Sequence, residues 1–149
     1  MENCGSNGNT WDYQRANEEI QAAIASGHTL VLPLASLIES GNHIAHAPNY
    51  RYETALRLAD VIGKTADQRN PWAAFTDQAG LWTAGNLKRL SQEWPKLANR
   101  KVAIGDATIA HVANFYRQMG CEVRLLTGDS DLSKFEPLPP TLVPRRRRP

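Results

Sequence analysis

The sequence predicts an α/β fold, in which helices cover both faces of a small central parallel sheet to form a three-layer α/β/α sandwich. Two short, mostly apolar runs, Thr29–Leu32 and Val123–Thr127, are the expected strands. They alternate with longer stretches whose apolar residues recur every three or four positions, the spacing of an amphipathic helix. Because helices cover both faces of a parallel sheet, its strands are nearly continuous apolar runs. Such alternation of strands and helices is typical of α/β proteins.

The expected helices follow in order, each with a sequence signal at one end. Residues 12–26 form the first, closed by Gly27, and a second begins near residue 35. Asn49 is expected to cap a third helix over 50–62. A fourth over 86–94 is closed by Pro95, and a fifth begins near residue 106 and ends at Gly120, since glycine tolerates the left-handed turn that closes helices.

The connection over residues 63–86 is less regular and rich in aromatic residues. Trp72, Phe75 and Trp82 favour a small satellite core beneath a long connection. The alternatives are stacking on nucleic-acid bases and, for the segment Pro71–Trp82, contacts within a homodimer.

Length and composition indicate one domain between two polar ends. Of the 149 residues, 42% are hydrophobic, which suffices for a single core. We expect a flexible lead over 1–11, the domain over 12–136, and a disordered Pro- and Arg-rich tail over 137–149. No run is long enough to span a membrane, and no signal peptide is evident. With only two cysteines, far apart, the sequence favours a cytoplasmic protein.

The net charge of +2 depends on the tail. Four of the 17 basic residues are Arg145–Arg148, which leaves 13 basic residues against 15 acidic ones elsewhere. A slightly acidic body does not fit a protein that coats DNA. The arginines are expected either to add phosphate affinity that is independent of base sequence or to be a solvated tail.

Acidic residues follow the extended segments. Glu39 lies in the helix after the first strand, Asp106 begins a helix, and Asp129 and Asp131 follow the second strand. Ligands of open α/β sheets bind at the carboxyl ends of strands, so we expect these acids to converge. Such a cluster repels itself unless a cation neutralises it, and oxygen ligands favour Mg²⁺ or Mn²⁺. The implied chemistry is phosphodiester hydrolysis.

Each acid also has a purely structural interpretation. An aspartate at the start of a helix commonly caps it, and Gly-Asp-Ser-Asp at 128–131 is ordinary turn chemistry. Glu39 together with His43 and His46 is a weaker alternative metal site, based only on helical spacing.

Three motifs together resemble those of a PIN domain: LIESGNHIA around Glu39, GDATIAHVA around Asp106 and LLTGDSDL around Asp129. In that family a parallel sheet flanked by helices gathers acidic residues around Mg²⁺ or Mn²⁺. The resemblance implies that Glu39, Asp106 and Asp129 are catalytic metal ligands, the second, third and fourth acids of the set. It also implies that Asp131 is an accessory ligand and that Thr127 is the hydroxyl residue supporting the last acid.

Most active PIN domains are ribonucleases, and many are toxins of toxin–antitoxin pairs. The resemblance therefore implies a metal-dependent ribonuclease with RNA as its substrate. Further implied partners are an antitoxin-like protein and a second copy of the chain.

One departure from the family is serious. A PIN domain begins with a strand that ends in an aspartate, and nothing before Trp11 resembles a strand. Either the sequence begins at an internal methionine of a longer product, or this strand is absent. In the second case the alternative is a catalytically inactive PIN-like module that binds RNA or a protein partner.

Two other enzyme classes fit less well. LLTGDS resembles a strand-end motif of haloacid-dehalogenase-like phosphatases, but the paired aspartates of their first strand are missing. No Gly-x-Ser-x-Gly motif supports a serine nucleophile.

Overall fold

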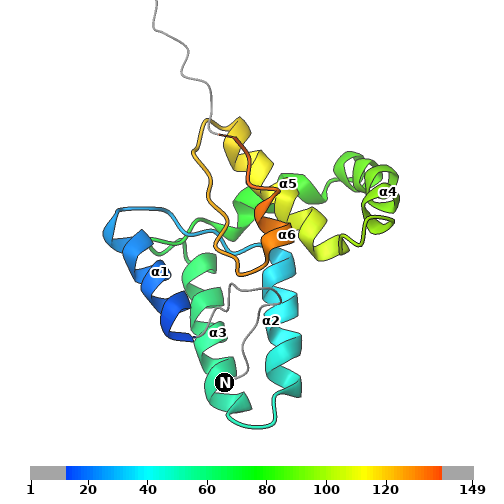
Figure 1. Ribbon diagram of the computed structural model, residues 1–149. Helices are drawn as coiled ribbons and strands as arrows, with labels where there is room; N and C mark the ends of the chain where they lie inside the picture. Colours follow the sequence, from blue (N-terminus) through cyan, green and yellow to red (C-terminus); the bar gives the residue numbers. More distant parts are fainter. Residues whose placement is uncertain (1–12, 139–149) are drawn as a thin grey trace, which may run out of the picture.

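Helices form nearly all the regular structure in the computed structural model, which describes residues 13–138 (Figure 1). The predicted lead and almost all of the predicted tail, with the Arg145–Arg148 run, lie outside the described residues. The elements are α1 (Tyr13–Ala25), α2 (Leu34–His46), α3 (Arg51–Ala66), the 3-10 helix η1 (Phe75–Trp82), α4 (Ala84–Ala98), α5 (Ile104–Gln118) and α6 (Ser130–Ser133).

The prediction of an α/β/α sandwich with a central parallel sheet is wrong, because residues 13–138 contain no sheet. The first expected strand, Thr29–Leu32, makes one isolated parallel bridge, between Leu30 and Trp72. Two hydrogen bonds form it: the Leu30 amide donates to the Pro71 carbonyl and the Ala73 amide to the Leu30 carbonyl, both at 2.8 Å. A strand needs a partner along its length, and here the pairing stops after one residue.

The second expected strand, Val123–Thr127, has neither helical nor strand structure. Burial alternates along it, with residues 123, 125 and 127 half-buried and 124 and 126 exposed, as in a strand with one covered face. Its amide at Leu125 donates to a side chain, Oε2 of Glu136, at 2.8 Å. The alternation is therefore present without backbone pairing.

The helix predictions are confirmed for five segments, but both ends of the third helix and the C-terminal end of the fourth are wrong. Gly27 and Gly120 close α1 and α5 with φ of 74° and 88°, and the amides of the following residues bond back to carbonyls five positions earlier, as in a Schellman turn. α3 continues past residue 62, and its N-cap is Tyr50 rather than Asn49. α4 continues through Pro95 to Ala98. Before the proline, Leu90 is buried and Trp94 Nε1 donates to the Val102 carbonyl at 3.3 Å.

The core is centred on α5, which packs against α2, α4 and η1. In Figure 1, α2 and α3 run side by side below α5, and α4 lies to the right of α5. One stripe of small and branched residues of α5 is buried: Gly105, Ala107, Ile109, Ala110, Val112 and Ala113. α5 therefore fixes the positions of the elements that surround it.

The aromatic connection packs as a satellite to this core. Trp72, Phe75 and Trp82 are half-buried, and Gln78 of η1 is buried, with its amide nitrogen donating to the Leu32 carbonyl at 2.8 Å. This favours packing over free aromatic rings for base stacking.

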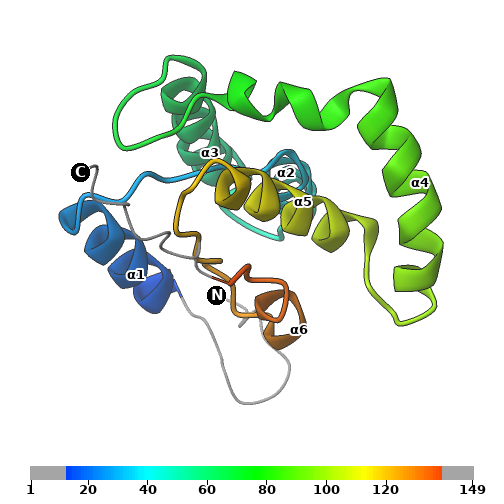
Figure 2. The same ribbon diagram turned by 90° about the horizontal axis from the view of Figure 1, so that it is seen from above.

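The paired helices α2 and α3 leave an open apolar groove of about 450 Å³ between them, lined by residues such as Ile44, Tyr52 and Leu58. Figure 2 views the helices from above, with α2 and α3 behind α5. No helix between residues 13 and 138 is long and apolar enough to cross a membrane.

Candidate acidic site

Asp106 lies in the first turn of α5, directly after buried Gly105. Its side chain is half-buried. Burial raises the pKa of Asp106 above its ordinary value, and the charge of Asp129 raises it further, while a backbone hydrogen bond at Ala103 lowers it. Because Asp129 acts on Asp106 through their charges, two of the three predicted catalytic acids lie within electrostatic reach of each other.

Glu39 reaches the same end of α5 from the middle of α2. If Gly105 carried a Cβ atom, this atom would collide with Oε1 of Glu39 and lie 3.3 Å from its Cδ. The Glu39 carboxylate therefore rests against the backbone next to Asp106, although the residue as a whole is exposed. The packing of α2 on α5 brings the Glu39 carboxylate to Gly105, 66 positions later in the sequence.

Asp129 is held by a turn of its own making. Oδ1 of Asp129 accepts the amides of Asp131, at 2.7 Å, and Leu132, at 3.4 Å, and so caps α6. The hydroxyl of Thr127 accepts the Asp129 amide at 3.0 Å. The turn interpretation of Gly-Asp-Ser-Asp is therefore confirmed, and Oδ2 of Asp129 takes no part in the cap. The capping interpretation of Asp106 is wrong, because the N-cap of α5 is Ala103 and no side chain caps this helix.

Asp131 is directed to a different partner. Its Oδ1 lies 2.5 Å from Nζ of Lys134, one helical turn further on. Both side chains are largely exposed, so this pair contributes little to stability. A cation near Asp129 would compete with Lys134 for Asp131.

The described residues include no group of three or more His, Cys, Asp or Glu side chains that could hold a metal ion as they stand. The alternative site of Glu39, His43 and His46 is therefore not formed, and Nδ1 of His46 donates to the Asn42 carbonyl at 2.8 Å. Of the three acids, Asp106 and Asp129 act on each other through their charges, whereas Glu39 lies against Gly105. Carboxylate oxygens are the kind of ligand that Mg²⁺ or Mn²⁺ takes. An ion there would have to draw the three carboxylates together.

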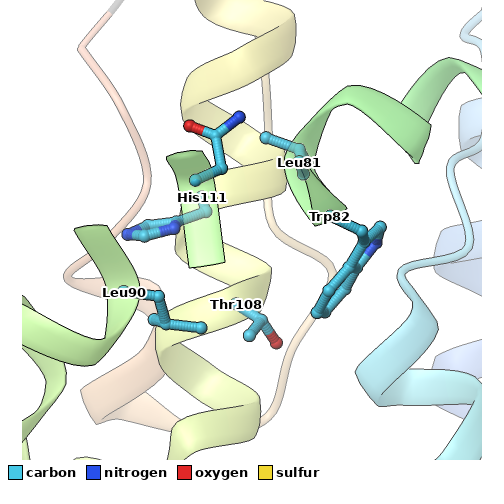
Figure 3. Close-up of a pocket in the computed structure, with 6 residues that line it drawn as sticks. Leu81, Trp82, Leu90, Thr108 and His111 are labelled. Atoms are coloured by element: carbon cyan, nitrogen blue, oxygen red, sulfur yellow. The ribbon is translucent and has the colours of Figure 1, made fainter. Parts of the chain in front are cut away.

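A small cavity lies further along α5, where it meets α4 and η1. Leu81, Trp82, Asn86, Leu90, Thr108 and His111 line it, and its volume of about 10 Å³ matches a single water molecule (Figure 3). Nε2 of His111 pairs with Oε2 of Glu93 at 3.3 Å, a contact that sequence spacing could not indicate. The cavity is too small for a nucleotide or a cofactor.

Sequence reasoning missed Gly105 as part of the site. The available signal was a glycine directly before the acid that opens a helix, in Gly105-Asp106. Glycine is a poor helix former, so its presence there called for an explanation from packing.

A comparison with known proteins finds no matching family model, no matching curated sequence and no matching solved structure. The resemblance to PIN domains therefore rests on the sequence motifs alone.

Proposed function

We propose that the chain is a ribonuclease that hydrolyses RNA phosphodiester bonds with Mg²⁺ or Mn²⁺ held by Glu39, Asp106 and Asp129. The observation that supports this most directly is the meeting of acids from distant segments at the start of α5. Glu39 of α2 contacts Gly105, and Asp129 raises the pKa of Asp106. Acids of like charge are costly to bring together, and a divalent cation removes that cost.

The bound ion would polarise the phosphodiester and activate water for in-line attack. The protein's own residues would each hold it differently. Asp106 supplies a half-buried carboxylate whose raised pKa reflects poor solvation, so it gains most from a cation. Asp129 supplies Oδ2 while Oδ1 keeps the turn fixed. Asp131, the accessory ligand that the resemblance implies, would have to leave Lys134 in order to contribute.

The order of the acids along the chain agrees with this proposal. Glu39, Asp106 and Asp129, with Thr127 before the last, follow the arrangement of PIN domains, most of whose active members are ribonucleases. The proposal concerns the acidic site and does not depend on a central sheet.

The test is cleavage of a labelled single-stranded RNA with Mn²⁺, Mg²⁺ or EDTA, comparing the wild type with Asp106→Asn. We expect cleavage with either ion, none with EDTA, and a loss of roughly 100-fold or more in Asp106→Asn, since even residues that only orient metal ligands affect activity about 10- to 100-fold. Asp67→Asn is the matched control, because Asp67 is exposed and paired with Arg69 at 2.9 Å, outside the site. Cleavage that survives EDTA, or a folded wild type that does not cut, would overturn the proposal.

The second candidate is a catalytically inactive module that binds RNA or a protein partner. The observation that favours it is the lack of a ready three-ligand group among residues 13–138. It predicts that fluorescence anisotropy detects binding of the same RNA in EDTA, equally in the wild type and in Asp106→Asn, without cleavage in any condition. Cleavage that requires the ion and Asp106 excludes this candidate.

A further inference from the structure

We propose that the apolar groove between α2 and α3 is an interface between two copies of this chain, in which α3 of each copy lies antiparallel in the groove of the other. The two pairs of helices would then form a four-helix bundle. This inference goes beyond the proposed function, since it involves neither a metal ion nor RNA.

The hairpin of α2 and α3 has no closed core of its own. None of the 13 residues of α2 is buried, and Thr65 is the one buried residue among the 16 of α3. In α5, by contrast, six of 15 residues are buried. Helices of this length are marginal by themselves in water, and the packing of an apolar face supplies most of their stability. In the single chain, much of that face of the hairpin is uncovered.

The groove is formed by this uncovered face. Tyr52 and Ile62, which line it, are 73% and 37% exposed. The segment Pro71–Trp82, the candidate from the sequence for homodimer contacts, contributes none of the large hydrophobic side chains that are exposed among residues 13–138. Because contiguous exposed apolar surface marks interaction sites, the surface that a second copy could cover lies on α2 and α3.

The order of residues along α3 fits a second copy of the same helix. A two-fold axis presents that helix in the opposite direction, so that residue i contacts j and j contacts i. With the axis between Leu58 and Ala59, these two residues oppose each other across the interface. Ala55 of each copy then opposes Ile62 of the other, and all four residues line the groove. At both levels a large side chain faces an alanine, the alternation that lets facing helices interdigitate.

Charge favours the same antiparallel direction. Arg51 is the one charged residue in the lining of this groove, and its Nη1 donates to the Ala47 carbonyl at 2.9 Å, at the connected end of the hairpin. A parallel pairing would bring the two arginines together, and like charges repel. The antiparallel pairing separates them and sets each beside Ala66 of the other copy, the last residue of α3. The carbonyl groups at that end of a helix carry partial negative charge.

The first test is the mass of the full chain in solution, measured by light scattering after gel filtration and by sedimentation equilibrium. The wild type should be a dimer. Ala59→Glu should weaken dimerisation by roughly 100-fold or more, because the new carboxylate would be buried opposite Leu58 without a partner. Ala59 is exposed in the single chain, so this variant should remain folded, as circular dichroism measures.

Leu56→Glu is the matched control for Ala59→Glu. Leu56 is 52% exposed and does not line the groove, so the same added charge there should leave the dimer intact. Dimerisation that Leu56→Glu weakens as much as Ala59→Glu does would overturn the proposal, since the effect would then come from net charge.

Cross-linking tests the antiparallel direction. In a chain whose native Cys4 and Cys121 are replaced by serine, the double variant Ala55→Cys/Ile62→Cys should form a disulfide-linked dimer on oxidation. The single variant Ala55→Cys should not, because the two copies of residue 55 would lie about 10 Å apart along the helices, too far for a disulfide.

Three outcomes contradict the proposal. One is a wild type that remains a monomer at about 100 μM, since interfaces of standard size reach micromolar affinity or better; the groove would then be left to a different occupant. The second is a dimer that Ala59→Glu leaves intact, and the third is a dimer that the double cysteine variant does not cross-link. None of these outcomes changes the prediction of ion-dependent cleavage at the acidic site.

Discussion

The two ends of the acidic site are built in different ways. Asp106 belongs to α5, whose inward face is buried against α2, α4 and η1, so the packed core determines where its carboxylate lies. Asp129 belongs to an exposed turn after an extended segment, and hydrogen bonds to residues 127, 131 and 132 determine its position. Tertiary packing thus places one acid, and local turn chemistry places the other.

Because of this difference, we expect mutations at the two ends of the site to have different effects. A residue that packs α5 affects every element that touches it, including α2 with Glu39. A residue in the turn affects four residues of α6 and little else. Substitutions on α5 should therefore lower the stability of the whole fold, whereas substitutions in the turn should disturb only local structure.

The largest expected effect on stability comes from the α5 side. Ile109 is 8% exposed, and truncation to alanine leaves a cavity in the core, so Ile109→Ala should lower the free energy of unfolding by about 2–4 kcal/mol. Leu126→Ala is the matched truncation in the extended segment, where the side chain is 40% exposed, and should cost less than about 1 kcal/mol. Urea denaturation measures both. Equal losses would mean that the extended segment is as much a part of the core as α5.

The same difference explains which parts of the structure the sequence could predict. Helices α1, α2, α3 and α5 follow from local signals, namely apolar spacing and the closing glycines Gly27 and Gly120. The strand predicted over residues 123–127 does not form, although burial alternates along them. The sheet does not follow, because pairing needs a neighbouring strand at the correct distance and register, and an apolar run cannot show whether that neighbour exists.

The same distinction between local and tertiary contacts applies to the acidic site. The cap at Asp129 is local and could be predicted from Gly-Asp-Ser-Asp. The approach of Glu39 to Gly105 depends on how α2 crosses α5, and no spacing within either segment indicates it. The continuation of α4 through Pro95 to Ala98 is another feature that the local stop signal did not indicate.

A smaller effect on stability separates the role of Asp129 as an N-cap from the role of its charge. Asp129→Ala removes the acceptor for two amides of α6, and loss of an N-cap costs roughly 1 kcal/mol. Asparagine caps about as well as aspartate, so Asp129→Asn should keep stability within a few tenths of a kcal/mol. Both variants should lose Mn²⁺-dependent cleavage, measured on the same RNA. Retained cleavage in Asp129→Asn would show that the turn serves the fold alone.

The smallest effect is a pH dependence that belongs to Asp106. Burial is the main cause that raises the folded-state pKa of Asp106 above its ordinary value of 3.8. The protonated carboxyl group therefore contributes stability that is fully present below about pH 3.8 and is lost as the pH rises through the raised pKa. Asp106→Asn does not titrate, so the stability of the variant relative to the wild type should increase from acid to neutral pH. Urea midpoints of both proteins across this range measure the difference, with Asp67→Asn as the control for net charge. If the stability of Asp106→Asn relative to the wild type instead falls as pH rises, Asp106 is better solvated in the folded protein than its place beside buried Gly105 implies. The contrast between the packed Asp106 and the exposed Asp129 would then disappear.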